Sequence, residues 1–257
     1  VNFYRLDQFG DFSMRVAKNS FGELFKTLMV AGSIAIIFRS IFFEPFNIPS
    51  GSMIPTLLVG DYLFVSKYSY GYSKYSFPFG VMPINDRVFD NSPERGDVIV
   101  FRKPGDETID YIKRLVGLPN DTIQVKEGIL FINGKSVNRI KTNIGKMKDI
   151  NGNEKILTEY KEIFEGSNYH KILEYSDIDN FDDTIEFKVP KDHFFFMGDN
   201  RDNSRDSRSS EVGFVPKKNL IGKAQIIFFS HDNSASFYEF WKWHKSIRFS
   251  RIGEAIK

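Results

Sequence analysis

The sequence predicts a mostly β fold that is attached to one N-terminal transmembrane helix. A single long apolar segment occupies residues 27–43. After it, short apolar runs alternate with turn residues, which is typical of buried strands. Between two of these runs lies Asn133-Gly134, the strongest short signal for a β-hairpin. We therefore expect an anchor at the start of the chain and antiparallel sheets in the rest.

The apolar segment TLMVAGSIAIIFRSIFF is predicted to be an uncleaved membrane anchor. As a helix it would extend about 26 Å, slightly less than the roughly 30 Å of a hydrocarbon core, so Arg39 would have to reach the interface. A buried core helix and a cleaved signal peptide are the alternatives, because residues 28–38 also fit the apolar region of a signal peptide. The bulky sequence IFFEPF stands where such a peptide would need small residues for cleavage.

The charges that flank this segment predict its orientation. From residue 44 to residue 66 there is no lysine or arginine, whereas residues 1–26 contain Arg5, Arg15, Lys18 and Lys26. Basic residues concentrate on the cytoplasmic side of membrane helices. We expect residues 1–26 in the cytoplasm, residues 27–43 in the membrane and residues 44–257 outside the cytoplasm.

The predicted strands lie in apolar runs at residues 61–71, 95–104, 107–121, 123–138, 194–197 and 220–230. The Asn133-Gly134 hairpin is expected to form a type I′ turn. Residues 138–189 differ from the rest, since they are rich in Lys, Asp, Glu and Asn with weaker apolar periodicity. We interpret them as a peripheral insertion with weak strands.

Composition excludes several kinds of site. The chain has 257 residues and no cysteine, so it has no thiol nucleophile, disulfide or cysteine-ligated zinc. Its four histidines are scattered, and no metal or other cofactor is expected. A net charge of only +2 argues against a general nucleic-acid binder.

Three features could carry chemistry, and each has a simpler structural explanation. Ser52 follows Gly51 in a proline-bracketed turn, where a hydroxyl can be exposed, but it could be an ordinary turn serine. Lys113 lies within an apolar strand and would share one face with Tyr111 and Leu115, although strand lysines are usually solvated at an edge. The segment MGDNRDNSRDSR follows a buried strand and could be a salt-bridged turn.

Together and in this order, four segments resemble bacterial type I signal peptidases, membrane-anchored Ser-Lys proteases that remove signal peptides from exported proteins. The segments are FFEPFNIPSGSMIPTLLVGDYLFVSKYSYG, RGDVIVFRKP, DYIKRLVGLPND and MGDNRDNSRDSR. They include the end of the anchor and most of the predicted β core, while residues 138–189 fall in the variable insertion of that family. The family often has two N-terminal membrane spans, and this chain is expected to have one.

The resemblance implies a fold and a set of roles. The fold would be the Ser-Lys protease β core with a β-rich insertion. Ser52 would be the nucleophile and Lys113 the general base. The oxyanion would be bound by the Ser50 hydroxyl and the Ser52 backbone N–H. Ser204 would orient Lys113, and Asp206 and Arg208 would support the site from behind. The shallow substrate pockets would be lined by Ile48, Met53, Leu57, Tyr111 and Ile112.

The chemistry explains why these residue types are needed. A serine hydroxyl is a weak nucleophile until a base takes its proton, and an ammonium group has no lone pair to do so. The lysine must therefore be neutral, with a pKa lowered by desolvation from about 10.4. The apolar strand around Lys113 offers such an environment.

The resemblance further implies signal peptides of secretory preproteins as partners and the bacterial cytoplasmic membrane as the location. The aromatic and basic stretch SFYEFWKWHKSIRFS suits either membrane lipid or packing against the β core. A self-cleaving Ser-Lys protease of the repressor type is the alternative enzyme, but a helix-turn-helix domain and no anchor would be expected there. A membrane-anchored β domain that only binds partners is the alternative without an enzyme activity.

Overall fold

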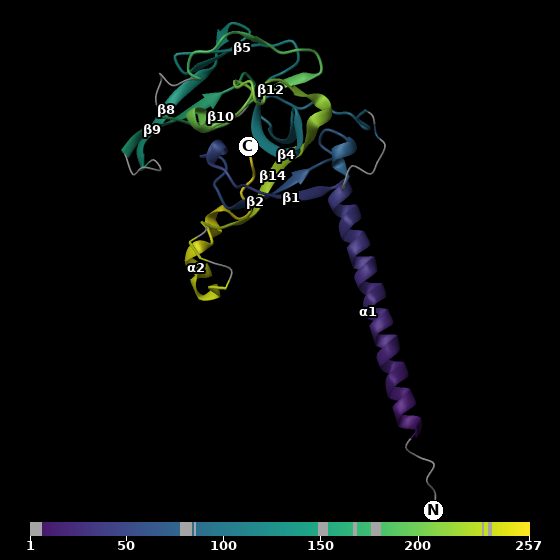
Figure 1. Cartoon of the computed structure of the whole chain (residues 1–257). Coiled ribbons are helices and arrows are strands. Elements are labelled where there is room, and N and C mark those ends of the chain that lie inside the picture. Colours follow the sequence, from purple (N-terminus) through teal and green to yellow (C-terminus); the bar gives the residue numbers. More distant parts are fainter. Residues whose placement is uncertain are drawn as a thin grey trace, which may run out of the picture.

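The computed structural model describes residues 7–77, 84, 86–148, 154–166, 169–175, 181–232, 234–235 and 238–257. One long helix, α1 (Asp7–Ile41), extends away from a β domain that contains the described residues from Phe43 onward (Figure 1). The fold is mostly β with one N-terminal apolar helix, which confirms the predicted fold class.

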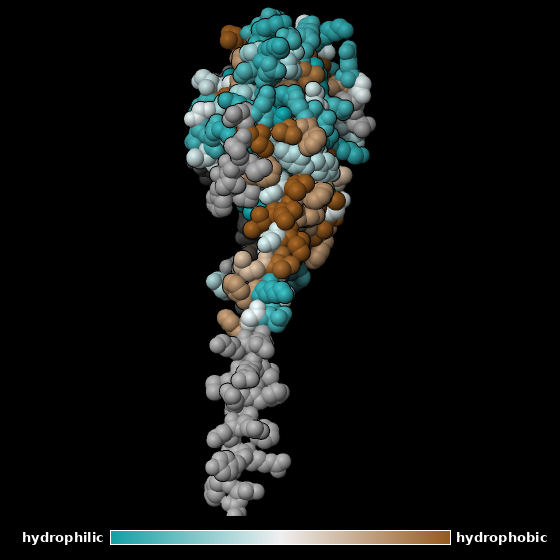
Figure 2. Space-filling model, turned by 90° about the vertical axis from the view of Figure 1, so that its right-hand side faces the viewer, coloured by the Kyte–Doolittle hydropathy of each residue, from teal (hydrophilic) through white to brown (hydrophobic). Residues whose placement is uncertain are grey.

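Within α1, residues Phe21–Ile41 are long and apolar enough to cross a membrane. Their side chains are almost all exposed, so this is not the buried core helix considered above. Figure 2 shows hydrophobic residues along the part of the helix next to the domain, whereas most of the domain face turned toward the viewer is hydrophilic. A surface of this kind is compatible with lipid and costly in water.

The helix ends two residues earlier than the predicted anchor. It stops at Ile41, and Phe43 already begins strand β1 (Phe43–Asn47), which the sequence analysis did not predict. Pro45 explains the boundary, because proline lacks the N–H that a helix interior needs and disfavours helix at the preceding residue. Proline is tolerated in β1 because this strand lies at the edge of its sheet.

The central sheet has seven antiparallel strands and contains most of the core. Its spatial order is β1, β2 (Asp61–Ser66), β14 (Leu220–Ser230), β3 (Val98–Lys103), β4 (Asp106–Gly117), β12 (His193–Met197) and β13 (Val215–Pro216). Two clusters of buried side chains pack on it: one around Met53, Leu63 and Ile227, the other around Phe101, Leu115 and Phe196. Strand β4 is therefore held between β3 and β12 in the interior of the sheet.

A second sheet contains the predicted hairpin. It consists of β11 (Phe187–Lys188), β5 (Thr122–Lys126), β6 (Ile129–Ile132) and β7 (Lys135–Ser136). Asn133 and Gly134 have φ angles of 52° and 77° between the paired residues Ile132 and Lys135. Both central residues of a two-residue type I′ turn have positive φ, so the predicted hairpin turn is confirmed.

The insertion forms regular strands rather than the weak ones expected. Three antiparallel strands, β8 (Asn138–Lys148), β9 (Glu154–Ile163) and β10 (Tyr169–Glu174), make a sheet of their own. Apolar periodicity is weak here because charged side chains, including Glu162, His170 and Glu174, occupy buried positions, whereas Ile144 and Ile156 are exposed. In Figure 1 this sheet lies on the side of the domain away from α1.

The last part of the chain returns to the central sheet. After β14, a short helix α2 (Trp243–Ser246) lies on the same side of the domain as α1 (Figure 1). The final residues then pair with β14, since the Ile227 N–H donates to the Glu254 carbonyl and the Ile256 N–H to the Gln225 carbonyl.

Candidate active site

The turn that carries Ser52 connects β1 to β2. Ser50 has an extended backbone, and a 3₁₀-helix, η1 (Gly51–Met53), follows it. Ser52 is 8% exposed, and Met53 beside it has no exposed surface. Burial of Met53 in the core beneath the turn explains why a short loop can hold Ser52 in one place.

Lys113 lies in the interior strand β4 and meets Ser52. Its Nζ donates to Ser52 Oγ over 2.7 Å and to the Ile112 carbonyl over 2.9 Å. The side chain is 2% exposed, so the alternative of a solvated edge lysine does not apply. Burial lowers the pKa of Lys113 from 10.5 to about 8, although Asp206 and Asp199 oppose the shift. At pH 7 the protonated amine therefore still predominates, and the neutral amine becomes the major form above about pH 8.

Ser50 lies beside this pair but is not fixed to it. Its Oγ is 3.4 Å from Ser52 Oγ, longer than an ordinary hydroxyl hydrogen bond, and its side chain is exposed. An exposed hydroxyl can still rotate toward a group that is bound at Ser52.

The segment after β12 closes the other side of the site. Asp206 and Arg208 are buried and form an ion pair of 2.9 Å, and the Gly198 N–H donates to Asp206 Oδ2. Burial would raise the pKa of Asp206, but Arg208 outweighs this and holds it below its usual value. The Asp206 carboxylate therefore stays charged near Lys113.

Ser204 is buried, and among the contacts of the described residues no hydrogen bond joins it to Lys113. It contacts Gly198, where an added Cβ would collide with the Ser204 hydroxyl and the Ser52 carbonyl. Glycine is therefore required at position 198 for this turn to approach Ser52. That Ser204 orients Lys113 stays a prediction.

The five residues expected to line substrate pockets fall into two groups. Ile48, Met53 and Leu57 belong to the buried core, the last two with no exposed surface, so they support the turn in this structure. Tyr111 and Ile112 are only partly buried and flank Lys113. The Tyr111 ring lies 5.2 Å from Lys113 Nζ. A direct contact with substrate stays a prediction for all five.

Sequence reasoning missed Asn200, which holds the turn with Ser52 through two hydrogen bonds. Its backbone N–H donates to the Ser52 carbonyl over 3.1 Å, and its Nδ2 donates to the Gly51 carbonyl over 3.0 Å. Asn200 lies within MGDNRDNSRDSR, but only its position two residues after Gly198 could have drawn attention to it.

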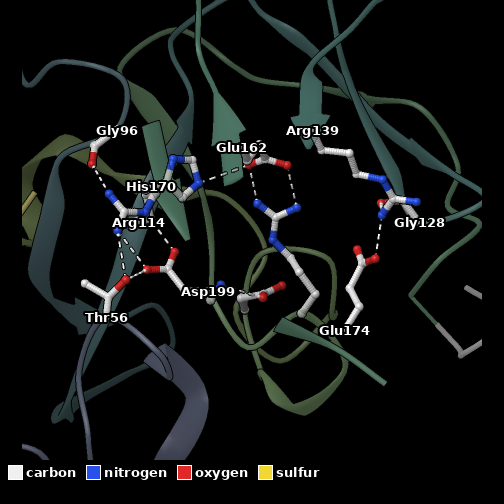
Figure 3. A network of polar contacts seen from close by, with 12 residues as sticks. Thr56, Gly96, Arg114, Gly128, Arg139, Glu162, His170, Glu174 and Asp199 are labelled. Atoms are coloured by element: carbon white, nitrogen blue, oxygen red, sulfur yellow. Dashed lines mark hydrogen bonds and ion pairs between the residues drawn. The ribbon is translucent and has the colours of Figure 1, made fainter. Parts of the chain in front are cut away.

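A buried ion pair next to the site was also missed. Arg114 directs its guanidinium to both oxygens of Asp199, at 2.8 and 2.7 Å, and its Nη1 to the Gly96 carbonyl (Figure 3). Thr56, four residues after Ser52, donates its hydroxyl to the same Asp199 carboxylate. This network links β4, the turn with Ser52 and the segment after β12.

The described residues contain no group of three or more His, Asp or Glu side chains that could hold a metal ion. What the site offers is a serine hydroxyl, a buried amine with a lowered pKa, and a shell of ion pairs that fixes both. Proton transfer from the hydroxyl to the amine, followed by nucleophilic attack, is the chemistry that such an arrangement can perform.

A β domain on an apolar helix, with a serine and a buried lysine in contact, is an arrangement expected of a membrane-associated peptidase. Comparison with known proteins agrees with this class. The family described as "Signal peptidase, peptidase S26" matches residues 21–229. The chain therefore belongs to the signal peptidase family, and the resemblance inferred from its motifs is confirmed.

Two relatives from Rickettsia species support the same assignment. The signal peptidase I of Rickettsia typhi is 42% identical over 239 residues, which cover 85% of this chain and 88% of that protein. That of Rickettsia prowazekii is 39% identical over 260 residues, 93% of this chain and 94% of the relative. A crystal structure of a signal peptidase I from Enterococcus faecalis is 26% identical, covers 52% of this chain and 97% of that one, and has a TM-score of 0.30.

Proposed function

We propose that this chain is an endopeptidase that removes N-terminal signal peptides from exported preproteins, with Ser52 as nucleophile and Lys113 as general base. The observation that carries the mechanism is the 2.7 Å contact between Lys113 Nζ and Ser52 Oγ in a buried site. Membership of the signal peptidase family supports the substrate class.

The reaction proceeds in two halves. Neutral Lys113 accepts the Ser52 hydroxyl proton while Oγ forms a bond to the scissile carbonyl carbon. The carbon–nitrogen bond then breaks, and the Lys113 ammonium returns a proton to the departing amine. Water, deprotonated by the same lysine, hydrolyses the acyl-enzyme and restores Ser52.

The developing oxyanion needs donors that are already in place. The Ser52 backbone N–H and the Ser50 hydroxyl are the proposed pair, and a donor of this kind is worth about 3 to 4 kcal/mol in comparable sites. Ser50 is free to turn toward the oxyanion because it is exposed and its contact with Ser52 is long.

A peptide substrate would bind as an added strand. One edge of β4 pairs with β3 from Asp106 onward, whereas β12 pairs with the opposite edge only from Arg114 onward. Within the described part of the chain, that opposite edge has no strand partner at residues 107–112, immediately before Lys113. An extended peptide can satisfy these backbone groups and present its carbonyl to Ser52.

We also propose a topology and a contact with lipid. Residues 1–26 would be cytoplasmic, residues 27–43 would form the anchor, and residues 44–257 would form the extracytoplasmic catalytic domain at the bacterial cytoplasmic membrane, with 138–189 a variable insertion. Support comes from the asymmetry of basic residues and from the exposed apolar surface of α1. The position of α2 on the same side as α1 favours contact of Trp241 and Trp243 with lipid (Figure 1).

The direct test uses the full chain in detergent and a peptide with alanine at positions −3 and −1 of a signal peptide cleavage site. Mass spectrometry should show cleavage after the −1 alanine, and Ser52→Ala should abolish it. Cleavage by the Ser52→Ala variant at the wild-type rate would overturn the proposal.

A further inference from the structure

A buried carboxylate of the insertion lies directly behind the active site. Glu162, on β9, is 1% exposed, and both of its oxygens accept hydrogen bonds from the guanidinium of Arg201, the first over 2.9 Å. His170, its cross-strand neighbour on β10, places Nε2 at 3.1 Å from the same carboxylate (Figure 3). The mechanism above uses none of these three side chains.

Arg201, which pairs with Glu162, directly follows Asn200, whose hydrogen bonds hold the turn with Ser52. Arg201 begins the 3₁₀-helix η4 (Arg201–Asn203), and the residue before it is Asn200. Asn200 binds the carbonyls of Gly51 and Ser52 through its side chain and its backbone. A displacement of Arg201 would therefore shift the hydrogen bonds that position the turn with Ser52.

Hydrogen bonds from the backbone of the insertion place it against the same segment. The Leu173 N–H donates to the Asp199 carbonyl over 2.8 Å, and the Tyr175 N–H donates to the side-chain Oδ2 of Asp202 over 2.6 Å. The first bond fixes the backbone before Arg201, and neither bond constrains the Arg201 side chain. The forked pair with Glu162 constrains it, because two parallel hydrogen bonds fix both the distance and the plane of the guanidinium.

The charges of the cluster suit a permanent ion pair. Burial would raise the pKa of Glu162, but Arg201 and then His170 outweigh it and hold the pKa below its usual value. Burial, helped by the Arg114 cation, lowers the pKa of His170, so the imidazole is neutral near pH 7. One carboxylate thus neutralises one guanidinium in a site without solvent.

We propose that Glu162 is a positioning residue of the active site, which fixes Arg201 and thereby the Asn200 contacts that hold Ser52 against Lys113. The inference rests on the proposed role of Ser52 as nucleophile. The insertion, whose composition suggested a peripheral segment, would then help to set the geometry of the catalytic residues. Compared with apolar side chains, a buried ion pair adds little to stability, so we assign its presence here to geometric specificity.

The test compares Glu162→Gln with Glu159→Gln in the full chain. Glu159 lies on the same strand and pairs with the half-exposed Lys171, so it is a matched control away from Arg201. At a temperature well below the melting point of each variant, kcat of Glu162→Gln should fall about 10- to 100-fold with KM nearly unchanged, because small misplacements of a nucleophile have effects of this size. Glu159→Gln should keep both constants. A Glu162→Gln variant with wild-type kcat at that temperature, whatever its melting point, would overturn the proposal.

Double substitution identifies the route of the effect. If Glu162 acts through Arg201, then Glu162→Gln should lower kcat no further in an Arg201→Gln background. Independent, multiplicative losses would contradict this route. If Glu162→Gln does not fold, Arg201→Lys replaces it, because lysine keeps the positive charge but cannot form both hydrogen bonds to Glu162. This variant should show the same loss of kcat. A wild-type kcat for Arg201→Lys would overturn the proposal.

The outcome is separable from that of the proposed function. An inactive Ser52→Ala variant together with a fully active Glu162→Gln variant would refute the positioning role alone. An active Ser52→Ala variant would refute the nucleophile, regardless of what Glu162→Gln does.

Discussion

Lys113 Nζ lies 2.7 Å from Ser52 Oγ, although 61 residues separate the two in the chain. The contact exists because β4 is an interior strand and because the turn with Ser52 is held from three sides: by the core under Met53, by Asn200 and by the Thr56–Asp199 hydrogen bond. The pair is therefore a consequence of the whole domain, and its chemistry can be tested by disturbing each support in turn.

The pH dependence of cleavage should follow the titration of Lys113. Only the neutral amine can accept the serine proton, and its pKa is lowered to about 8 by burial. We expect kcat/KM to rise with pH, about tenfold per unit below pH 8, and to level off above it. A profile that is flat from pH 6 to pH 9 in a folded enzyme, checked by circular dichroism at each pH, would contradict a lysine base.

Removal of the Arg114 guanidinium should destabilise the domain strongly. Arg114→Ala would leave the buried Asp199 carboxylate without its ion-pair partner, which typically costs about 3 to 5 kcal/mol. Glu211→Gln is the control, because it breaks a long pair with Arg205 at an exposed site, where about 0.5 kcal/mol or less is expected. Denaturant unfolding of both variants measures the difference, and equal stabilities would show that the Arg114–Asp199 pair does not support the fold.

The topology can be tested with single cysteines, since the chain has none of its own. Ser136→Cys, at an exposed position of β7, should react with a membrane-impermeant maleimide in intact spheroplasts. Ser13→Cys, before the anchor, should react only after the membrane is permeabilised. Labelling in the opposite order would refute the proposed orientation.

The two tryptophans allow the contact with lipid to be measured without a label. Trp241 and Trp243 are the only tryptophans in the sequence and are 57% and 38% exposed. In vesicles, brominated acyl chains should quench the fluorescence of the full chain, because a headgroup position lies within reach of the upper acyl carbons. Quenching by aqueous iodide, with no effect of brominated lipid, would place the two tryptophans in water and contradict the lipid contact.

Sequence reasoning predicted the parts of this fold that have local signals. The anchor, the Asn133-Gly134 turn and the strand of Lys113 each follow from a run of residues or a dipeptide. Strand β1 was missed because its phenylalanines continue the apolar anchor segment, and the end of the helix depends on Pro45 and on pairing with β2.

The supports of the site were harder to predict because they depend on residues distant in sequence. Arg114 follows Lys113 in the strand, so its side chain points to the opposite face of β4, but only tertiary structure covers that face with Asp199. Glu162 lies in a segment whose composition is typical of a solvated surface. Its burial follows from pairing of β9 and β10 and from packing against η4, neither of which has a local sequence signal.

The most direct test of the central claim is the activity of Lys113→Arg. Arginine keeps the charge and nearly the reach of lysine, but its guanidinium stays protonated at any usable pH and cannot accept the Ser52 proton. Lys171→Arg, at a half-exposed position, is the control that should keep full activity. With both variants shown to be folded by circular dichroism and melting, cleavage of the alanine-containing signal peptide by Lys113→Arg should fall by about 10²- to 10⁴-fold or more. A folded Lys113→Arg enzyme that keeps more than about a tenth of wild-type activity would contradict the Ser-Lys mechanism.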